Sequence, residues 1–132
     1  MPHSPRVGCG ALIRNAQNQI LLVKRLREPE AGHWGFPGGK VDFGETTEDA
    51  TCREVTEELG ITITLGPLAH LVNYIDIPKG EHWLAPVYTA VISNGEPEIQ
   101  EPDALSEWGW FDEDALPEKL TEATCQTVSA KR

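Results

Sequence analysis

The 132 residues carry 21 acidic and 11 basic side chains, which gives a formal net charge of −10. Nucleic-acid binding and membrane-surface binding usually depend on basic patches, so this charge argues against both kinds of partner. With 39% hydrophobic and 24% charged residues, the composition is that of a globular protein, and the length predicts one domain over residues 1–132.

The cysteine pattern and the N-terminal residues bear on the cellular compartment. Cys9, Cys52 and Cys125 form no C-x-x-C pair, and the first two lie in apolar patterns, so we expect free thiols in a reducing environment. Residues 1–6 lack the apolar segment of a signal peptide, and no stretch is long and apolar enough to span a membrane. We therefore predict a cytoplasmic protein, and its state as monomer or homodimer stays open.

The first quarter of the chain predicts two strands and a short third one. Residues 7–13 and 19–25 have strand patterns and are joined by a polar turn. Lys24 and Arg25 end the second strand and form the only adjacent basic pair before the C-terminal tail. After a loop at residues 26–32, residues 34–36 read as a short strand whose aromatic rings are expected to be buried.

A helix is predicted directly after the pair Gly38–Gly39 and a short loop. Thr46 suits the N-cap, with Asp49 as an acidic variant of the capping box, and Gly60 is placed to end the helix in the left-handed conformation. At 100° per residue, the buried stripe is formed by Cys52, Val55 and Leu59, and the opposite arc by Arg53, Glu54, Glu57 and Glu58.

The acidic arc of this helix is unfavourable unless it binds something. Like charges three and four residues apart weaken a helix by a few tenths of a kcal/mol per pair, and divalent cations would reverse that effect. Carboxylate oxygens without histidine or cysteine suit Mg²⁺ or Mn²⁺, and Mg²⁺ in proteins is often shared with substrate phosphates. The alternative is a solvated acidic face with no ligand.

The spacing across residues 39–61 is that of a known motif. Every fixed position of the Nudix box is present, namely Gly39, Glu45, Arg53-Glu54-Val55, Glu57-Glu58 and Gly60-Ile61. The chain resembles a Nudix hydrolase. Arg14-Asn15 followed by NQILLVKR, and the PGGK run at residues 37–40, are similar to MutT-like nucleoside triphosphate pyrophosphohydrolases. The resemblance implies an α/β (α+β) Nudix fold, in which a mixed β-sheet is sandwiched between helices and carries the loop-helix-loop box.

The resemblance also implies roles for residues in and around the box. Metal ligands would be Glu54, Glu57 and Glu58, the backbone carbonyl of Gly38, and one carboxylate from the acidic loop at residues 98–107, with Glu101 preferred over Asp103. Gly39 would lie against the substrate, and Lys24 or Arg25 would contact its phosphates unless that strand end is simply solvated. We choose Glu54 as general base, with Glu45 or a loop carboxylate as alternatives. Arg53 is expected to orient a box glutamate through a bidentate pair.

The second half of the chain predicts a hairpin and a shorter C-terminal part. Residues 61–65 read as extended and are broken by Gly66–Pro67, and residues 68–77 and 83–92 read as a hairpin in which Pro86 indicates an edge position or a bulge. Tyr74 and Trp83 could offer flat faces to a base across that hairpin, although core packing explains them equally well. Residues 108–111 read as a strand, residues 112–120 begin with helix-cap signals, and the resemblance implies a short helix in the tail.

These features predict Mg²⁺-dependent hydrolysis of a nucleoside triphosphate to the monophosphate and diphosphate. The nearest alternative is hydrolysis of another nucleoside diphosphate derivative such as ADP-ribose. A non-catalytic nucleotide-sensing module is a third hypothesis, and the presence of all four box glutamates disfavours it.

Overall fold

The computed structural model describes residues 4–130. Within them the elements follow in the order β1 (Arg6–Ile13), β2 (Ile20–Arg25), β3 (Trp34–Gly35), β4 (Gly38–Lys40), α1 (Thr47–Leu59), β5 (Thr62–Asp76), β6 (Glu81–Asn94), β7 (Leu105–Phe111) and α2 (Glu122–Ala130). The strands form two sheets, with the orders β4-β1-β6-β5 and β3-β2-β7. Because β1 runs parallel to β6 and antiparallel to β4, the larger sheet is mixed, as predicted.

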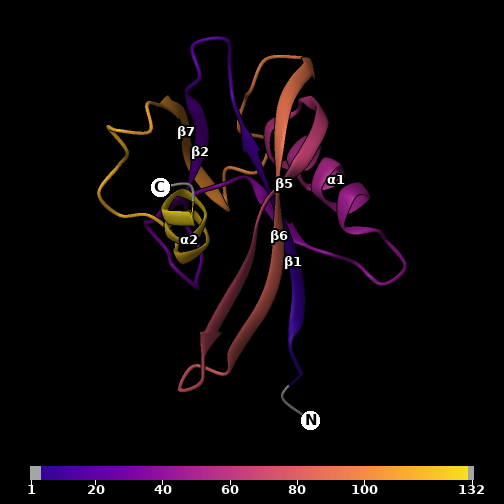
Figure 1. Ribbon diagram of the computed structural model, residues 1–132, viewed down its shortest axis with the longest axis vertical. Helices are drawn as coiled ribbons and strands as arrows, with labels where there is room; N and C mark the ends of the chain where they lie inside the picture. The colour runs from indigo at the N-terminus through magenta and orange to yellow at the C-terminus, as the bar shows by residue number, and fades with distance from the viewer. Residues whose placement is uncertain (1–3, 131–132) are drawn as a thin grey trace.

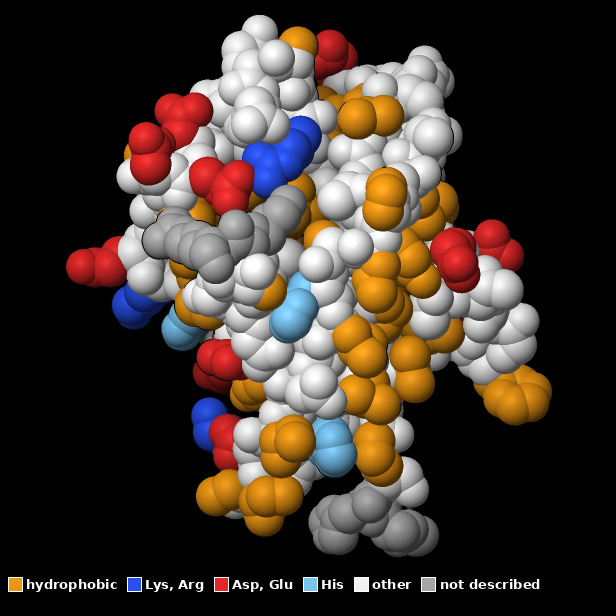
Figure 2. All heavy atoms as spheres, viewed as in Figure 1, with side chains coloured by type: hydrophobic (Ala, Val, Ile, Leu, Met, Phe, Trp, Pro, Cys, Tyr) orange, Lys and Arg blue, Asp and Glu red, His pale blue; other side chains and the backbone are white. Residues whose placement is uncertain are grey.

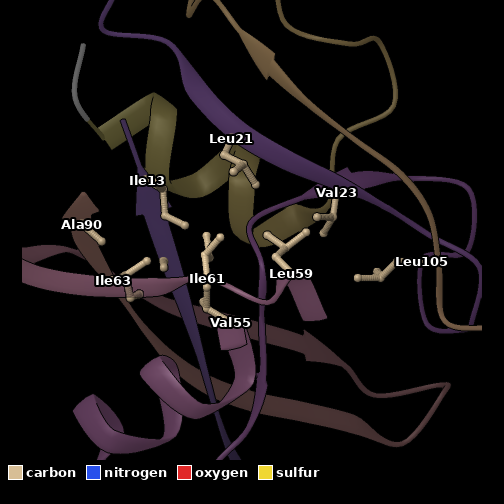
Figure 3. Packing of buried hydrophobic residues seen from close by; sticks show 10 residues of the cluster. Ile13, Leu21, Val23, Val55, Leu59, Ile61, Ile63, Ala90 and Leu105 are labelled. Atoms are coloured by element: carbon tan, nitrogen blue, oxygen red, sulfur yellow. The ribbon is translucent and has the colours of Figure 1, made fainter. Parts of the chain in front are cut away.

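The two helices lie on opposite sides of the sheets, and the β5–β6 hairpin extends beyond both of them as a long arm (Figure 1). On the α1 side, the core contains side chains from both sheets and the helix, including Ile13, Leu21, Val55, Leu59 and Ile63, which point toward one another in Figure 3. On the other side, a second cluster is formed by buried residues of β1, β2, β5 and β6, and Ala123 of α2 packs against it.

Helix α1 has the boundaries and the buried stripe that the sequence predicts. The side chain of Thr46 accepts a hydrogen bond from the Asp49 amide at 3.0 Å, and Gly60 adopts the left-handed conformation with φ +69°. Val55 and Leu59 are fully buried, and Cys52 packs beside them. The polar arc of the helix therefore faces away from the core.

Strand β5 differs from its prediction, because Gly66–Pro67 does not end it. The strand runs without interruption from Thr62 to Asp76, and the register with β6 shifts between Leu65 and Leu68. The hydroxyl of Thr89 on β6 donates a hydrogen bond to the Pro67 carbonyl at 2.8 Å, which supports the bulge.

Of the two alternatives that the sequence indicates for Pro86, an edge position or a bulge, the edge position is wrong. Strand β6 lies between β1 and β5, and its pairing with β1 skips from Leu84 to Val87. Proline has no N–H to donate, so a central strand can hold it only where the ladder is interrupted.

The C-terminal part also differs from its prediction in one segment. Residues 112–120 form turns and bends instead of a helix. The helix in the tail is α2, and the Thr121 hydroxyl accepts a hydrogen bond from the Thr124 amide at 3.3 Å in its first turn. Within residues 4–130, all three cysteines are unpaired, as predicted, with Cys9 buried and Cys125 exposed.

Apolar side chains lie exposed along one face of the arm, where Figure 2 shows them as a continuous band. Leu68, Leu71, Ile75 and Ile77 of the hairpin are between 48% and 76% exposed. In the described part of the chain, neither helix has the length and apolar content needed to cross a membrane.

Candidate active site

A pocket lies on the face of the larger sheet opposite α1. Glu58, Gly38 and Gly39 line one end, and Tyr74 and Trp83 line the other. Gly10 pairs with both Gly38 and Val87, and Trp83 lies four residues before Val87 on the same strand. At about 3.3 Å per residue, the two ends are separated by roughly 13 Å along the sheet. The pocket is therefore long enough to hold a nucleotide in an extended form.

The pair Gly38–Gly39 lets the backbone of β4 pass very close to its neighbours. A Cβ atom on Gly38 would overlap the carbonyl of Cys9, and one on Gly39 would overlap the carboxylate of Glu54. The amide of Gly38 donates a hydrogen bond to Oε1 of Glu58 at 3.2 Å. Only glycine permits this approach, which brings the acidic arc of α1 against the strand.

Arg53 is the centre of a hydrogen-bonded network on that arc. Its guanidinium binds both carboxylate oxygens of Glu45, at 2.7 and 2.9 Å, and donates to Glu57 at 3.1 Å and to the Lys40 carbonyl at 3.1 Å. The predicted bidentate pair is present, and its partner is Glu45. These hydrogen bonds from Arg53 lower the pKa of Glu45 to about 2. Glu45 is thereby held as an ionised anchor for the loop before α1.

The pKa values of Glu54 and Glu58, the two carboxylates closest to β4, are raised instead of lowered. Burial raises the pKa of Glu58 to about 8, and the charges of Glu54 and Glu101 add to this, while the Gly38 hydrogen bond opposes it. Burial also raises the pKa of Glu54, and the charge of Arg53 opposes that change. The site thus gathers carboxyl groups in a partly buried place, where the guanidiniums of Arg53 and Arg25 and the amides of Gly38 and Lys40 do not offset the effect of burial.

This donor set fits a hard divalent cation by its chemistry, because it consists of oxygen atoms with excess negative charge. Within residues 4–130, no three acidic, histidine or cysteine side chains already stand at metal-ligand spacing. The carboxylates would therefore have to close around an ion on binding it.

The structure separates the two basic residues at the end of β2. Arg25 lines the pocket, its charge lowers the pKa of Glu58, and its Nε donates to the Pro29 carbonyl at 2.9 Å. Lys24 does not line the pocket and forms a 3.9 Å ion pair with Glu107 on β7. Side chains alternate between the faces of a strand, so only one of the pair can reach the pocket.

The two candidate carboxylates of the acidic loop, Glu101 and Asp103, also have different surroundings. The charge of Glu101 contributes to the raised pKa of Glu58, but Glu101 does not line the pocket. Asp103 instead pairs with Arg27 at 2.6 Å on the surface.

At the aromatic end, Tyr74 and Trp83 are direct cross-strand partners on β5 and β6. The indole N–H of Trp83 donates to Glu81 at 2.7 Å, and the guanidinium of Arg6 lies 5.4 Å from the ring centroid. These two contacts fix the orientation of the indole ring beside the pocket.

Sequence reasoning missed several pocket residues that come from distant segments. Glu30 lies in the loop after β2, and Thr121 and Ala123 lie at the start of α2. The close packing of Gly35 against Thr121, where a Cβ would lie 2.6 Å from the hydroxyl oxygen, joins these segments. No periodic pattern or motif marks these positions, because their proximity arises only from the tertiary fold.

Comparisons with known proteins agree with the geometry. The family model of the NUDIX domain matches residues 4–128. A crystal structure of a MutT NUDIX hydrolase from Burkholderia pseudomallei is 52% identical and superimposes with a TM-score of 0.92, over 96% of this chain and 97% of that chain.

Two curated relatives extend the comparison. A putative 8-oxo-dGTP diphosphatase 2 from Mycobacterium tuberculosis is 36% identical over 75% of this chain and 69% of its own length. An ADP-ribose pyrophosphatase from Methanocaldococcus jannaschii is 33% identical over 86% of this chain and 65% of its own length. The predicted Nudix fold is confirmed. The chain belongs to the NUDIX family and is a Nudix hydrolase, an enzyme that cleaves acid anhydrides.

Proposed function

We propose that this enzyme hydrolyses a nucleoside triphosphate to the nucleoside monophosphate and diphosphate in the presence of Mg²⁺, with Mn²⁺ as a possible substitute. The observation that supports this most is the position of two carboxylates: Glu58 lines one end of an extended pocket, and Glu54 lies against Gly39 at the same end. The aromatic end, with Tyr74, suits a base. The 36% identity to a relative named as a diphosphatase of a nucleoside triphosphate agrees with this substrate class.

We assign metal binding and proton transfer to particular residues of this chain. Glu54, Glu57 and Glu58, with the Gly38 carbonyl and Glu101, would hold Mg²⁺, which when bound shields the phosphate charge and acidifies a water molecule. Glu54 takes the proton as the water oxygen bonds to phosphorus, and the bridging oxygen of the anhydride leaves with the other phosphoryl group.

The surrounding residues position these groups and the substrate. Arg25 offers its positive charge to the phosphates from the pocket wall, and Gly39, which lines the pocket beside the Glu54 carboxylate, lies against the substrate. Arg53 holds Glu45 and Glu57 in place, so we propose that it acts as a positioning residue.

A panel of nucleoside triphosphates and nucleotide sugars, incubated with Mg²⁺, tests the proposal. Diphosphate and monophosphate are measured separately. Release of diphosphate from triphosphates supports the proposal, whereas formation of AMP from ADP-ribose alone would support the alternative, which the relative named as an ADP-ribose pyrophosphatase favours. If the enzyme hydrolyses neither class of compound, that result would favour a nucleotide-sensing module.

We also propose that residues 1–132 form one domain that works in the cytoplasm as a monomer or a homodimer. Light scattering coupled to gel filtration distinguishes the two oligomeric states.

A further inference from the structure

Glu30 has a backbone conformation that is unusual for its residue type. Its φ angle is +65°, in the left-handed region that residues other than glycine and asparagine rarely adopt. The Glu30 carbonyl accepts a hydrogen bond from the His33 amide at 3.2 Å. Its carboxylate oxygen Oε2 accepts one from the Glu122 amide, at the start of α2, at 2.7 Å. A backbone held in an unfavourable conformation by such contacts often serves the placement of a side chain.

The side chain of Glu30 lies at the aromatic end of the pocket. Glu30 lines the pocket together with Tyr74, Trp83 and Thr121. The pKa of Tyr74 is raised by burial, and among the nearby charges the carboxylate of Glu30 contributes most. Hydrogen bonds place Glu30 at this end of the pocket. The Glu122 amide binds Glu30, and Gln126 donates both to the Glu122 carboxylate and to the Asn73 carbonyl, next to Tyr74 on β5.

The two oxygens of this carboxylate have different surroundings. Oε2 is bound to the helix amide, whereas Oε1 has no hydrogen-bond partner within residues 4–130. An ionised carboxylate accepts hydrogen bonds and donates none, so the group that complements Oε1 must carry an N–H or O–H. An exocyclic amino group of a base meets this requirement, as when glutamate accepts from the amino group of cytosine, whereas a carbonyl oxygen at the same place would be repelled.

We propose that Glu30 is a specificity-determining residue, which selects nucleotides whose base carries an exocyclic amino group by accepting a hydrogen bond from that group at Oε1. This inference rests on the proposed function. The flat rings of Tyr74 and Trp83 beside the carboxylate supply stacking, which tolerates many bases, so the carboxylate would supply the discrimination.

The test uses pairs of substrates in which an exocyclic amino group is replaced by a carbonyl oxygen or by hydrogen, and a variant that keeps the helix contact. ATP is compared with ITP, GTP with ITP, and CTP with UTP, by kcat/KM. Glu30→Gln can still accept from the Glu122 amide through its carbonyl oxygen, and it places an NH₂ donor where Oε1 stood. Glu28→Gln is the matched control, because Glu28 is an exposed residue of the same loop, outside the pocket lining, whose carboxylate accepts from the Ala31 amide at 3.3 Å.

The wild-type enzyme is expected to favour the amino-bearing member of its best pair by about tenfold or more, the range of a hydrogen bond to a charged group. Glu30→Gln should erase or invert that ratio with an unchanged melting temperature, and Glu28→Gln should keep it. If Glu30 only caps α2, Glu30→Gln keeps that contact and the ratio should stay as it was in the wild-type enzyme.

Three results would overturn the inference or the proposal beneath it. Equal rates within every pair for the wild-type enzyme contradict the inference, even if Glu30→Gln fails to fold. If folded Glu30→Gln keeps the wild-type preference for the amino-bearing substrate, Glu30 does not determine that preference. Turnover of no triphosphate contradicts the proposed function instead, and the same comparison is then made between ADP-ribose and its inosine analogue.

Discussion

The two ends of the pocket differ in how their residues are brought together. The carboxylate end is formed mainly by one continuous segment, residues 38–58, whose side chains are held by hydrogen bonds within that segment. The aromatic end combines Tyr74 and Trp83 of the arm with Glu30 and Thr121, which come from a loop and a helix far apart in the sequence. The groups proposed for chemistry are thus specified locally, whereas the groups proposed to contact the base depend on the whole fold.

This difference separates the expected effects of mutation. Changes at the carboxylate end should lower the turnover number, and changes at the aromatic end should weaken substrate binding or alter preference. The experiments below follow from this contrast, from the largest expected effect to the smallest.

Replacement of Glu54 or Glu58 by glutamine should lower kcat by several orders of magnitude, because each change removes a charge from the proposed cation site and, for Glu54, the proposed base. Both side chains lie outside the apolar core, so circular dichroism and the melting temperature should show an intact fold. Glu48→Gln is the matched control, since Glu48 is exposed on the first turn of the same helix. A kcat close to wild type for either variant would contradict these roles.

Gly39→Ala tests whether the close approach of β4 to α1 matters. The new Cβ would overlap the Glu54 carboxylate and displace it, and a misplaced catalytic group can cost about 100-fold in rate. We expect a loss of this size in kcat with a small change in KM.

The mechanism of that loss can be checked with a double variant. If Gly39→Ala acts through Glu54, it should add little further loss to Glu54→Gln. Losses that multiply would show that Gly39 acts by another route.

Trp83→Ala tests the aromatic end. Loss of a stacking ring should raise KM about tenfold, consistent with 1–3 kcal/mol per stacked base, and leave kcat close to wild type. Trp83→Phe keeps a flat ring and should recover most of the affinity. An unchanged KM for Trp83→Ala would place the base elsewhere and remove the contrast between the two ends.

The smallest expected effect is a pH dependence of stability in metal-free protein. The folded-state pKa of Glu58, about 8, is above its ordinary value of 4.5, so the folded protein binds more protons between these values and loses stability as the pH rises from 4.5 to 8. Melting temperatures measured with a chelator should show this decline, and Glu58→Gln should flatten it. A decline that is unchanged in Glu58→Gln would assign it to other groups.

The same contrast explains what the sequence could and could not predict. Thr46, Gly60 and the stripe of α1 act within a few residues of one another, so capping rules and periodicity were sufficient. The partner of Arg53 is also within the box, eight residues away at Glu45.

Other features depended on contacts between distant segments. The alternation of side chains along a strand predicts that Lys24 and Arg25 face opposite sides of β2, but the packing of β2 against β7 decides which one reaches the pocket. Glu30 meets the amide of Glu122 across 92 residues, which no local pattern signals. Gly66–Pro67 predicts a break because turn residues usually end strands, yet a bulge in the pairing with β6 accommodates both residues.

The central claim is that Glu54 and Glu58 bind a divalent cation, and binding of Mn²⁺ measured by electron paramagnetic resonance tests it most directly. Wild-type protein and Glu48→Gln are expected to bind the ion with equal affinity, and Glu54→Gln and Glu58→Gln to bind it about tenfold more weakly or worse. Equal Mn²⁺ affinity in all four proteins, or no binding by the wild-type protein with a nucleotide present, would contradict the claim.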